Sequence, residues 1–182
     1  MDDREMVAAC LQGNPEEFRE IVMKYSPSTL AIALNILGNR DDAEDACQEA
    51  FIQAYRNLDK FDPERSFKNW LYTILYRRCL DQLKRRRRSL ALQKKIQREI
   101  PAAQLSNPPR PVQSRALPSR LLEVLSPKER MALCLWANEG YNAQEISSVL
   151  MCTASTARVY LFQARKKIKK VLEHDNVNLQ NC

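Results

Sequence analysis

Glycine and histidine are scarce in this sequence of 182 residues, which contains three glycines and a single histidine. The scarcity leaves no glycine-rich loop that would cradle a phosphate, and the motifs HExxH and GxSxG do not occur. The six cysteines stand singly without a CxxC pair, which excludes the usual zinc-ligand spacings. We therefore predict that the protein is not an enzyme and that it uses no metal and no cofactor.

Long apolar runs are also absent, since no stretch approaches the roughly 20 residues that span a bilayer. The chain opens with MDDREMVAAC, which lacks the charged-then-apolar layout of a signal peptide. We expect a cytoplasmic protein without membrane insertion. In a reducing cytosol the cysteines are expected to be small buried hydrophobic residues, and oxidant sensing by one of them is the alternative.

Basic residues outnumber acidic ones by 29 to 22, which gives a net charge of +7 and an isoelectric point near 9.2. Such a balance indicates a polyanionic partner, either nucleic acid or an anionic membrane surface. A surface that is merely basic and soluble is the alternative. The membrane interpretation is weaker, because no predicted helix combines a basic face with exposed large apolar side chains.

Few glycines and long apolar patterns with a period of 3.6 residues predict an all-α protein. Helix start signals recur at four places: Asn14-Pro15, Ser26-Pro27, Ser126-Pro127 and Asn142 to Glu145. Gly38 and Gly140 stand where helices should stop. The predicted helices span residues 4–12, 15–24, 27–37, 41–58, 65–86, 118–125, 127–139, 143–150 and 154–172.

The character of the chain changes after residue 88, where prolines become too frequent for a long helix. The segment RRSLALQKKIQREI can continue the preceding helix by a turn or two, before a proline-bearing linker. We predict two small helical domains joined by a flexible linker. Their bounds are an N-terminal bundle at 1–88, the linker at 89–117, a C-terminal module at 118–174 and a tail at 175–182.

The C-terminal module has a short helix, a tight turn and a long helix, the order of a helix-turn-helix. The long helix has one apolar stripe, which includes Ala157, Leu161 and Ala164, and its other faces are polar, basic or aromatic. Thr153 is a good N-cap for it. An ordinary helical hairpin with a solvated basic face is the alternative, and Met151, in a turn position that often carries glycine, weakens the DNA-binding interpretation.

The segment RDDAEDACQEAFIQAYRNL at 40–58 is acidic at its start and apolar on one face. Its carboxylates lie near the N-terminus of the predicted helix, where the helix dipole favours them by at best about 1 kcal/mol each. These carboxylates either only stabilise the start of the helix through its dipole or form a docking surface for a basic protein partner. An acidic surface in a basic chain is an improbable nucleic-acid-binding face.

The segment SFKNWLYTILYRRCLDQLKRRRR at 66–88 has large apolar residues on two opposite arcs. One arc holds Phe67 and Leu71, and the other holds Tyr72 and Tyr76, as in a helix packed on both sides. Between them lies a polar strip: Asn69, Thr73, Arg77 and Lys84, with Trp70 at its border. Such a mixture suits single-stranded nucleic acid, and an ordinary wet edge of a structural helix is the alternative.

In order and spacing, the segments DAEDACQEAF, SFKNWLYTI, LSPKERMALCLWANEGYNAQEISSVL and STARVYLFQARKKI closely resemble those of a bacterial sigma-70 family sigma factor. The resemblance is to the minimal extracytoplasmic-function (ECF) form and covers residues 5–173. It implies a sigma region 2 bundle and a sigma region 4 helix-turn-helix. It further implies binding to core RNA polymerase through the β′ clamp coiled coil and the β flap, recognition of promoter DNA, and a cognate anti-sigma factor.

The resemblance also implies roles for individual residues. The expected polymerase-binding residues are Asp45, Gln48 and Glu49. The residues expected to hold the single-stranded −10 element are Phe61, Ser66, Lys68, Asn69, Trp70, Thr73, Arg77 and Lys84. The residues expected to read the −35 duplex are Thr153, Ser155, Thr156, Arg158, Val159, Tyr160, Gln163 and Arg165.

Four positions depart from the family pattern and bear on the promoter sequences that the chain would select: Thr73, Arg77, Tyr160 and Gln163. The main alternative is a stand-alone helix-turn-helix transcriptional regulator with an N-terminal dimerisation bundle, which would bind its operator as a symmetric dimer. Under this alternative the acidic helix and the polar strip would have no function, which argues against it. A scaffold that mimics an anti-sigma antagonist is a further one.

Overall fold

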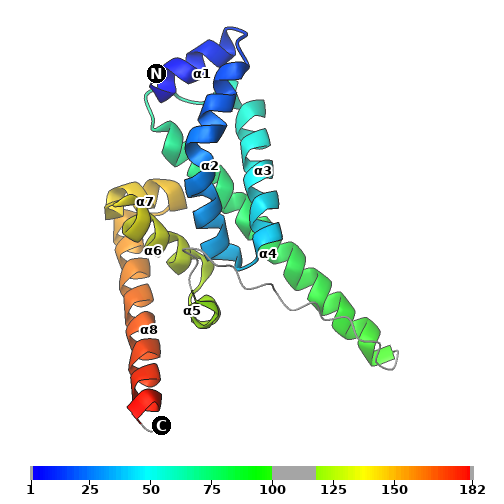
Figure 1. Cartoon of the computed structure of the whole chain (residues 1–182), viewed down its shortest axis with the longest axis vertical. Coiled ribbons are helices and arrows are strands. Elements are labelled where there is room, and N and C mark those ends of the chain that lie inside the picture. The colour runs from blue at the N-terminus through cyan, green and yellow to red at the C-terminus, as the bar shows by residue number, and fades with distance from the viewer. Residues whose placement is uncertain (1, 100–117, 181–182) are drawn as a thin grey trace.

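The structure is a computed structural model that describes residues 2–99 and 118–180 (Figure 1). These ranges contain helices and no strand, which confirms the all-α prediction. The helices are α1 (Asp3–Leu11), α2 (Glu16–Leu37), α3 (Arg40–Arg56), the 3-10 helix η1 (Leu58–Lys60), α4 (Phe67–Glu99), α5 (Ser119–Val124), α6 (Pro127–Glu139), α7 (Ala143–Leu150) and α8 (Ala154–Gln180).

Most helix ends follow local sequence signals. Ser126 and Asn142 form capping boxes, each with the glutamate three residues later, so the predicted starts of α6 and α7 are confirmed. Gly38 and Gly140 end α2 and α6 with φ of 69° and 70°, a left-handed conformation that glycine adopts without steric penalty. The prediction for Asn14 was wrong, because Pro15 occupies the cap position of α2.

The predicted break at Ser26-Pro27 was also wrong, because α2 continues through Pro27. Its buried face runs unbroken across the proline, so packing favours one helix: Ile21, Tyr25, Thr29, Ile32 and Ile36. Pro27 lacks the N–H that would bond to the carbonyl of Met23, a position open to water. The hydroxyls of Ser26 and Thr29 donate to carbonyls one turn back, at 2.6 and 2.9 Å.

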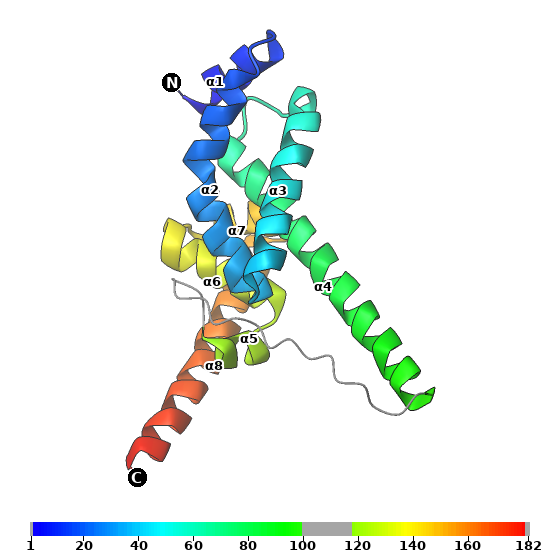
Figure 2. The ribbon, with the colours of Figure 1, turned by 45° about the vertical axis from the view of Figure 1, so that its right-hand side comes forward.

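The helix predicted at 65–86 also runs further than expected, since α4 reaches Glu99 and projects from the bundle in both views (Figures 1 and 2). Leucine, alanine, glutamine, lysine and arginine dominate the extension, and all have high helix propensity. The first eleven residues of the predicted linker are therefore helical, and its remainder, 100–117, lies outside the described residues. Helix α8 also extends beyond its predicted end at residue 172 and reaches Gln180. Of the predicted tail, only residues 181–182 lie outside the described residues.

Helices α2, α3 and α4 form the N-terminal bundle, while α6, α7 and α8 form the C-terminal module. The two units pack against each other, α6 on α2 and α7 on α4, and one continuous hydrophobic core extends through both. The second apolar arc of α4 meets this contact, because the Tyr72 ring lies 6.4 Å from that of Tyr141, between α6 and α7. The two-sided burial predicted for α4 thus has partners from both units.

Candidate protein- and nucleic-acid-binding surfaces

The acidic start of α3 lies on the surface of the bundle. Asn39 caps the helix by accepting a hydrogen bond from the backbone N–H of Asp42 at 2.9 Å. Asp45 and Gln48 are exposed on the following turns. Glu49 is half-buried, and its carboxylate lies 3.5 Å from the guanidinium of Arg85. The structure thus leaves the Asp45 carboxylate without an ion pair among the described residues and the Gln48 amide exposed.

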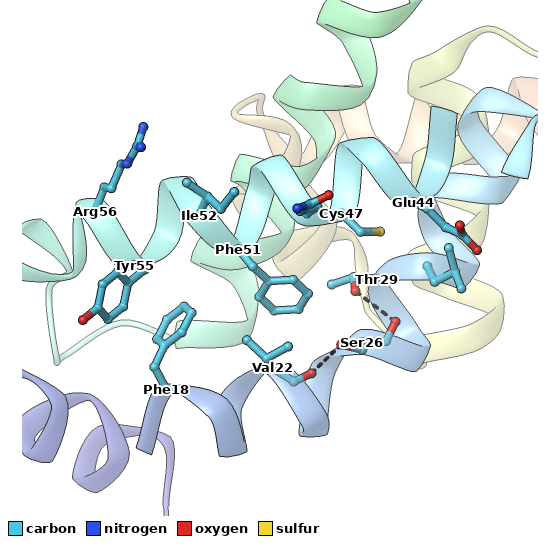
Figure 3. Close-up of a pocket in the computed structure, with 12 residues that line it drawn as sticks. Phe18, Val22, Ser26, Thr29, Glu44, Cys47, Phe51, Ile52, Tyr55 and Arg56 are labelled. Carbon is cyan, nitrogen blue, oxygen red and sulfur yellow. Dashed lines mark hydrogen bonds between the residues drawn. The ribbon is translucent and has the colours of Figure 1, made fainter. Parts of the chain in front are cut away.

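An apolar groove of about 540 Å³ lies between α2 and α3, beside these residues (Figure 3). Phe18 and Val22 of α2 face Phe51 and Tyr55 of α3 across it, and the rings of Phe18 and Tyr55 pack edge to face at 4.9 Å. Gln48 belongs to its lining. The α3 surface therefore combines carboxylates and an amide with an adjacent apolar depression. Sequence reasoning missed this depression because five of its twelve lining residues come from α2.

The loop before α4 is built on buried aromatic residues. The ring of Phe61 lies 5.3 Å from those of Phe67 and Trp70. Phe61 is buried, so it anchors the loop rather than presenting its own ring to solvent. Asp62 closes the turn by accepting from the backbone N–H of Glu64 at 3.0 Å, and residues 62–66 are exposed.

The polar strip of α4 opens onto a second cavity, of about 550 Å³, where aromatic, amide, hydroxyl and guanidinium groups meet. The predicted residues that the structure brings together there are Ser66, Asn69, Trp70, Thr73 and Arg77. Lys68 and Lys84 are not among the lining residues. Lys68 pairs with Glu139 at 2.6 Å, and Lys84 lies 3.6 Å from Asp81 on its own helix.

The C-terminal module closes one side of this cavity with Ser148 and Met151. It also bonds directly to the strip. The Tyr141 hydroxyl donates to the side-chain oxygen of Asn69 at 2.6 Å. The Thr73 hydroxyl donates to the carbonyl of Asn69, one turn back, at 2.8 Å and lies 3.3 Å from the carbonyl of Val149. The guanidinium of Arg77 lies 2.8 Å from the Met151 sulfur. Sequence reasoning missed these partners, and its only signal was the tyrosine-bearing second arc of α4.

The first turns of α8 present a polar face. Thr153 caps the helix by accepting from the backbone N–H of Thr156 at 3.1 Å, as predicted. Ser155, Arg158, Val159 and Gln163 are exposed. Of the predicted apolar stripe, Ala157, Leu161 and Ala164 are buried, whereas its end at Leu172 is exposed. Two other predicted residues contact α6 within the module, and Arg165 does so on its surface. Arg165 lies over the ring of Trp136 at 4.2 Å, and Tyr160 packs against the core with Lys128 over its ring. Phe162, exposed on this helix, was not predicted.

The turn between α7 and α8 is closed by Met151 in the left-handed conformation, with φ of 51°. The backbone N–H of Cys152 donates to the carbonyl of Ser147 at 3.0 Å. Met151 thus adopts the positive φ that its position suggested, and the helix-turn-helix forms without glycine. The strain is of the order of 1 kcal/mol for a residue with a Cβ atom.

The cysteines of the core are poorly suited to thiolate chemistry. Burial raises the pKa of Cys47 to about 11 and that of Cys134 to about 12, and it raises the pKa of Cys79 still further. These thiols are protonated at neutral pH and are weak nucleophiles. Among the described residues no cluster of histidine, cysteine, aspartate or glutamate could hold a metal ion. No helix in the same ranges is long and apolar enough to cross a membrane.

Comparison with known proteins gives concordant similarities. The family described as Sigma-70 region 2 matches residues 21–89, and the one described as Sigma-70, region 4 matches residues 119–168. The chain is 27% identical to the RNA polymerase sigma-H factor of Pseudomonas aeruginosa, over 94% of each chain. It is 29% identical to the ECF RNA polymerase sigma-E factor of Escherichia coli, over 92% of this chain and 93% of that one.

A similar fold occurs in the co-crystal structure of the sigma factor RpoE with the anti-sigma factor NepR from Bartonella quintana. The TM-score is 0.67 at 22% identity, with 87% of this chain and 98% of that one covered. At this identity the likeness concerns the fold alone.

Proposed function

Because the chain belongs to the sigma-70 family of RNA polymerase sigma factors, in its extracytoplasmic-function form, we propose that three separate surfaces divide its work. The protein binds core RNA polymerase and directs sequence-specific promoter recognition and transcription initiation. Sigma factors are non-catalytic initiation factors, so the polymerase performs the chemistry and this chain performs none. We place the protein in the cytoplasm, together with the polymerase that it serves.

The α3 surface is proposed to dock on the β′ clamp coiled coil. Asp45 and Gln48 are exposed and offer a carboxylate and an amide to basic and polar groups of a partner. The adjoining groove offers apolar area, which supplies most of the binding energy in a stable interface. Glu49 already forms an ion pair with Arg85, so its contribution to polymerase binding is expected to be smaller. The C-terminal module is proposed to bind the β flap.

The strip of α4 is proposed to hold the melted non-template strand of the −10 element. Trp70 supplies a stacking surface, Asn69 and Thr73 supply hydrogen-bonding groups, and Arg77 supplies a cation for the backbone. The exposed loop 62–66, anchored by buried Phe61, is proposed to capture a flipped base. Flipping a base costs a few kcal/mol, which stacking and pocket contacts offset.

The exposed face of α8 is proposed to read the −35 duplex in the major groove. Arg158 and Gln163 carry donors that suit base edges, and Val159 is an apolar group that suits a thymine methyl. The Thr153 cap orients the first N–H groups of the helix toward a phosphate. Tyr160 and Arg165, which are engaged with α6, are expected to contribute less to base reading.

An anti-sigma factor is proposed as a further partner. The similarly folded RpoE was crystallised with its anti-sigma factor NepR. The groove between α2 and α3 and the nearby acidic side chains form a surface that such an antagonist would share with the polymerase. Competition for this surface would keep the protein from initiating transcription.

The observation that carries the proposal is the separation of an exposed acidic surface on α3 from polar and basic strips on α4 and α8. A stand-alone helix-turn-helix regulator would need only the last of these. The test is to add the purified chain to core polymerase and genomic DNA and to map transcription start sites. We expect new starts that share −10 and −35 sequences. No new starts, together with tight dimeric binding of a palindrome by the free chain, would establish the regulator instead.

The docking assignment is tested with the double variant Asp45→Ala and Gln48→Ala. Each substitution removes an exposed side chain, so folding should be unaffected while affinity for core polymerase falls about tenfold or more. The matched control replaces an exposed aspartate and glutamine elsewhere, Asp59→Ala and Gln12→Ala. Equal affinities of the two double variants would show that α3 is not the docking surface.

A further inference from the structure

A tryptophan of α6 contacts an arginine of α8, the helix proposed to read the −35 duplex. The guanidinium carbon of Arg165 lies 4.2 Å from the centroid of the Trp136 ring. This distance is well inside the roughly 6 Å over which the face of an aromatic ring attracts a cation, and tryptophan attracts one most strongly. The contact therefore holds a flexible side chain of α8 against a neighbouring helix.

Both members of this pair remain accessible from solvent. Trp136 is 45% exposed, whereas Leu133 and Leu135 beside it are buried and supply the packing of α6. Arg165 is exposed as well. Large aromatic side chains that keep part of their surface in water are enriched at binding interfaces. The pair thus lies where a partner of the C-terminal module can reach it.

The contact leaves the guanidinium of Arg165 available to an anion. The attraction acts between the positive charge and the face of the ring, so it requires no carboxylate to accept from the five N–H groups. Among the described residues Arg165 pairs with no carboxylate. By contrast, the Lys167 ammonium lies 2.8 Å from the Glu129 carboxylate, so its charge is already used within the module. Arg165 is thus oriented without being neutralised.

The place of Arg165 along α8 suits the DNA backbone. Arg158 and Arg165 are both exposed and seven residues apart, which puts them on one side of α8 and about 10 Å apart along its axis. The first turns of a recognition helix contact base edges in a major groove that is about 8.5 Å deep. A side chain two turns beyond Arg158 therefore meets the rim of the groove, where the phosphates lie.

We propose that Trp136 is a positioning residue that holds Arg165 as a clamp for one phosphate of the −35 duplex. Arg165 then adds affinity that does not depend on base sequence, while base reading stays with the first turns of α8. A guanidinium that is already oriented loses less conformational freedom on binding, and it can donate two N–H groups to one phosphate. The inference rests on the proposed function of α8 and adds a role for α6.

The test uses the reconstituted holoenzyme and a labelled duplex that carries a mapped promoter. Trp136→Leu keeps an apolar side chain but removes the aromatic face, and Trp136→Phe is the matched control that keeps such a face. Fluorescence anisotropy should show binding about threefold to tenfold weaker for Trp136→Leu and within about twofold of wild type for Trp136→Phe. Far-UV circular dichroism verifies folding, and Trp136→Met takes the place of Trp136→Leu if the latter is unfolded.

Two further readouts separate positioning of Arg165 from general support of the fold. In the Arg165→Ala background, Trp136→Leu should have no further effect on affinity, since the tryptophan acts only through the arginine. Arg165→Ala should also lower the slope of log affinity against log salt by about 1, the share of one phosphate contact. Both single variants should lose affinity by the same factor on promoters that differ only in the −35 sequence.

Equal affinities of Trp136→Leu and wild type, or an undiminished loss in the Arg165→Ala background, would overturn the positioning role. A loss confined to one −35 sequence would show that the pair reads bases, which overturns the phosphate clamp. Weaker binding of Trp136→Leu to core polymerase without DNA would overturn it too, because the ring would then dock on the polymerase. Wild-type holoenzyme that binds the promoter no more tightly than core polymerase alone would instead overturn the proposed function.

Discussion

At the scale of single residues, Met151 shows a conflict between backbone conformation and residue type. Its φ of 51° is the one positive value at a non-glycine position in the described ranges. Its side chain is 60% exposed, so packing of the side chain compensates for little of the backbone strain. The turn geometry of the helix-turn-helix prevails over the preference of the residue, because Ala157, Leu161 and Val149 are buried on either side of the turn.

Replacing Met151 with glycine should raise the free energy of unfolding by about 1 kcal/mol, because glycine adopts positive φ without a Cβ clash. Loss of the exposed contact with Arg77 works in the opposite direction and is smaller. Urea denaturation measures the change. The control is Met23→Gly, at a methionine of 61% exposure inside α2, which should lower stability by about 1 kcal/mol. A lower free energy of unfolding in both variants would contradict the backbone strain at Met151.

Glu129 illustrates how one buried carboxylate links two helices. Its carboxylate accepts from the backbone N–H of Ser126 at 2.7 Å and from the Lys167 ammonium at 2.8 Å. Burial acts to raise the pKa of Glu129, but Lys167 and Ser126 outweigh it and lower that pKa below the ordinary 4.5. The charged form is thus the one that stabilises the fold. Its contribution is fully present above the unfolded pKa and is lost as pH falls through the folded pKa.

Glu129→Gln should therefore lower the free energy of unfolding by about 1 to 2 kcal/mol at pH 7, because Lys167 loses its buried anionic partner. The difference from wild type should shrink as pH falls below about 4.5 and through the lower pKa of Glu129 in the folded protein, where the native carboxylate becomes protonated. Urea denaturation across this range gives both values. For Glu173→Gln, whose carboxylate is exposed beside Lys169, we expect under about 0.5 kcal/mol. A pH-independent difference would exclude the ionic contribution.

At the scale of elements, helix α2 shows that a start signal can be overruled. Ser26-Pro27 has the sequence of a helix start, yet the apolar positions before and after it lie on one face and bury together. The same signal at Ser126-Pro127 does begin a helix, because Leu125 precedes it in extended backbone. Local chemistry permits a break at both places, and burial decides which one occurs.

Pro27→Ala should raise the free energy of unfolding by about 1 to 3 kcal/mol, because it restores a helix N–H and removes the ring clash. Pro127→Ala should leave stability nearly unchanged or lower it slightly, since proline is favourable at the first helical position. Thermal denaturation of both variants measures this contrast. Similar effects at the two prolines would indicate that Pro27 does not interrupt the hydrogen bonding of α2.

The basic run Lys84 to Arg88 lies on the exposed part of α4 beyond the cavity. Replacing Arg86, Arg87 and Arg88 with alanine should weaken holoenzyme binding to all promoter sequences alike. The slope of log affinity against log salt should fall by about 2 to 3, since each phosphate contact contributes about 0.7 to 0.9. The control replaces Arg19 and Lys24, which are exposed on α2 and are not among the residues that line the cavity. A loss confined to particular promoter sequences would show that the run reads bases.

At the scale of the whole molecule, the two units share one hydrophobic core, which crosses from α4 to α6 and α7. Calorimetry of the wild-type protein should therefore show a single unfolding transition. The variant Glu139→Lys with Tyr141→Phe should show two transitions, since each unit then unfolds by itself, and Glu123→Lys should keep one. Two transitions in the wild type would mean that the shared core does not couple the units.

The sequence by itself determined the helical class, the capping boxes at Ser126 and Asn142, and the polar face of α8. Each of these depends on residues within a few positions of one another, where period and capping chemistry are sufficient. The acidic start of α3 and the strip of α4 were predicted from the sequence for the same reason. The arc of α4 with Tyr72 and Tyr76 indicated burial but not the covering partner.

Only the tertiary structure decided what covers that arc and what the strip touches. Tyr141 meets Asn69 across 72 positions of sequence, and Arg130 meets Ile36 across 94. The groove between α2 and α3 and the engagement of Arg165 with Trp136 likewise require two helices to be placed side by side. A repeat along one helix specifies which face is buried, whereas the choice of partner depends on the packing of the entire chain.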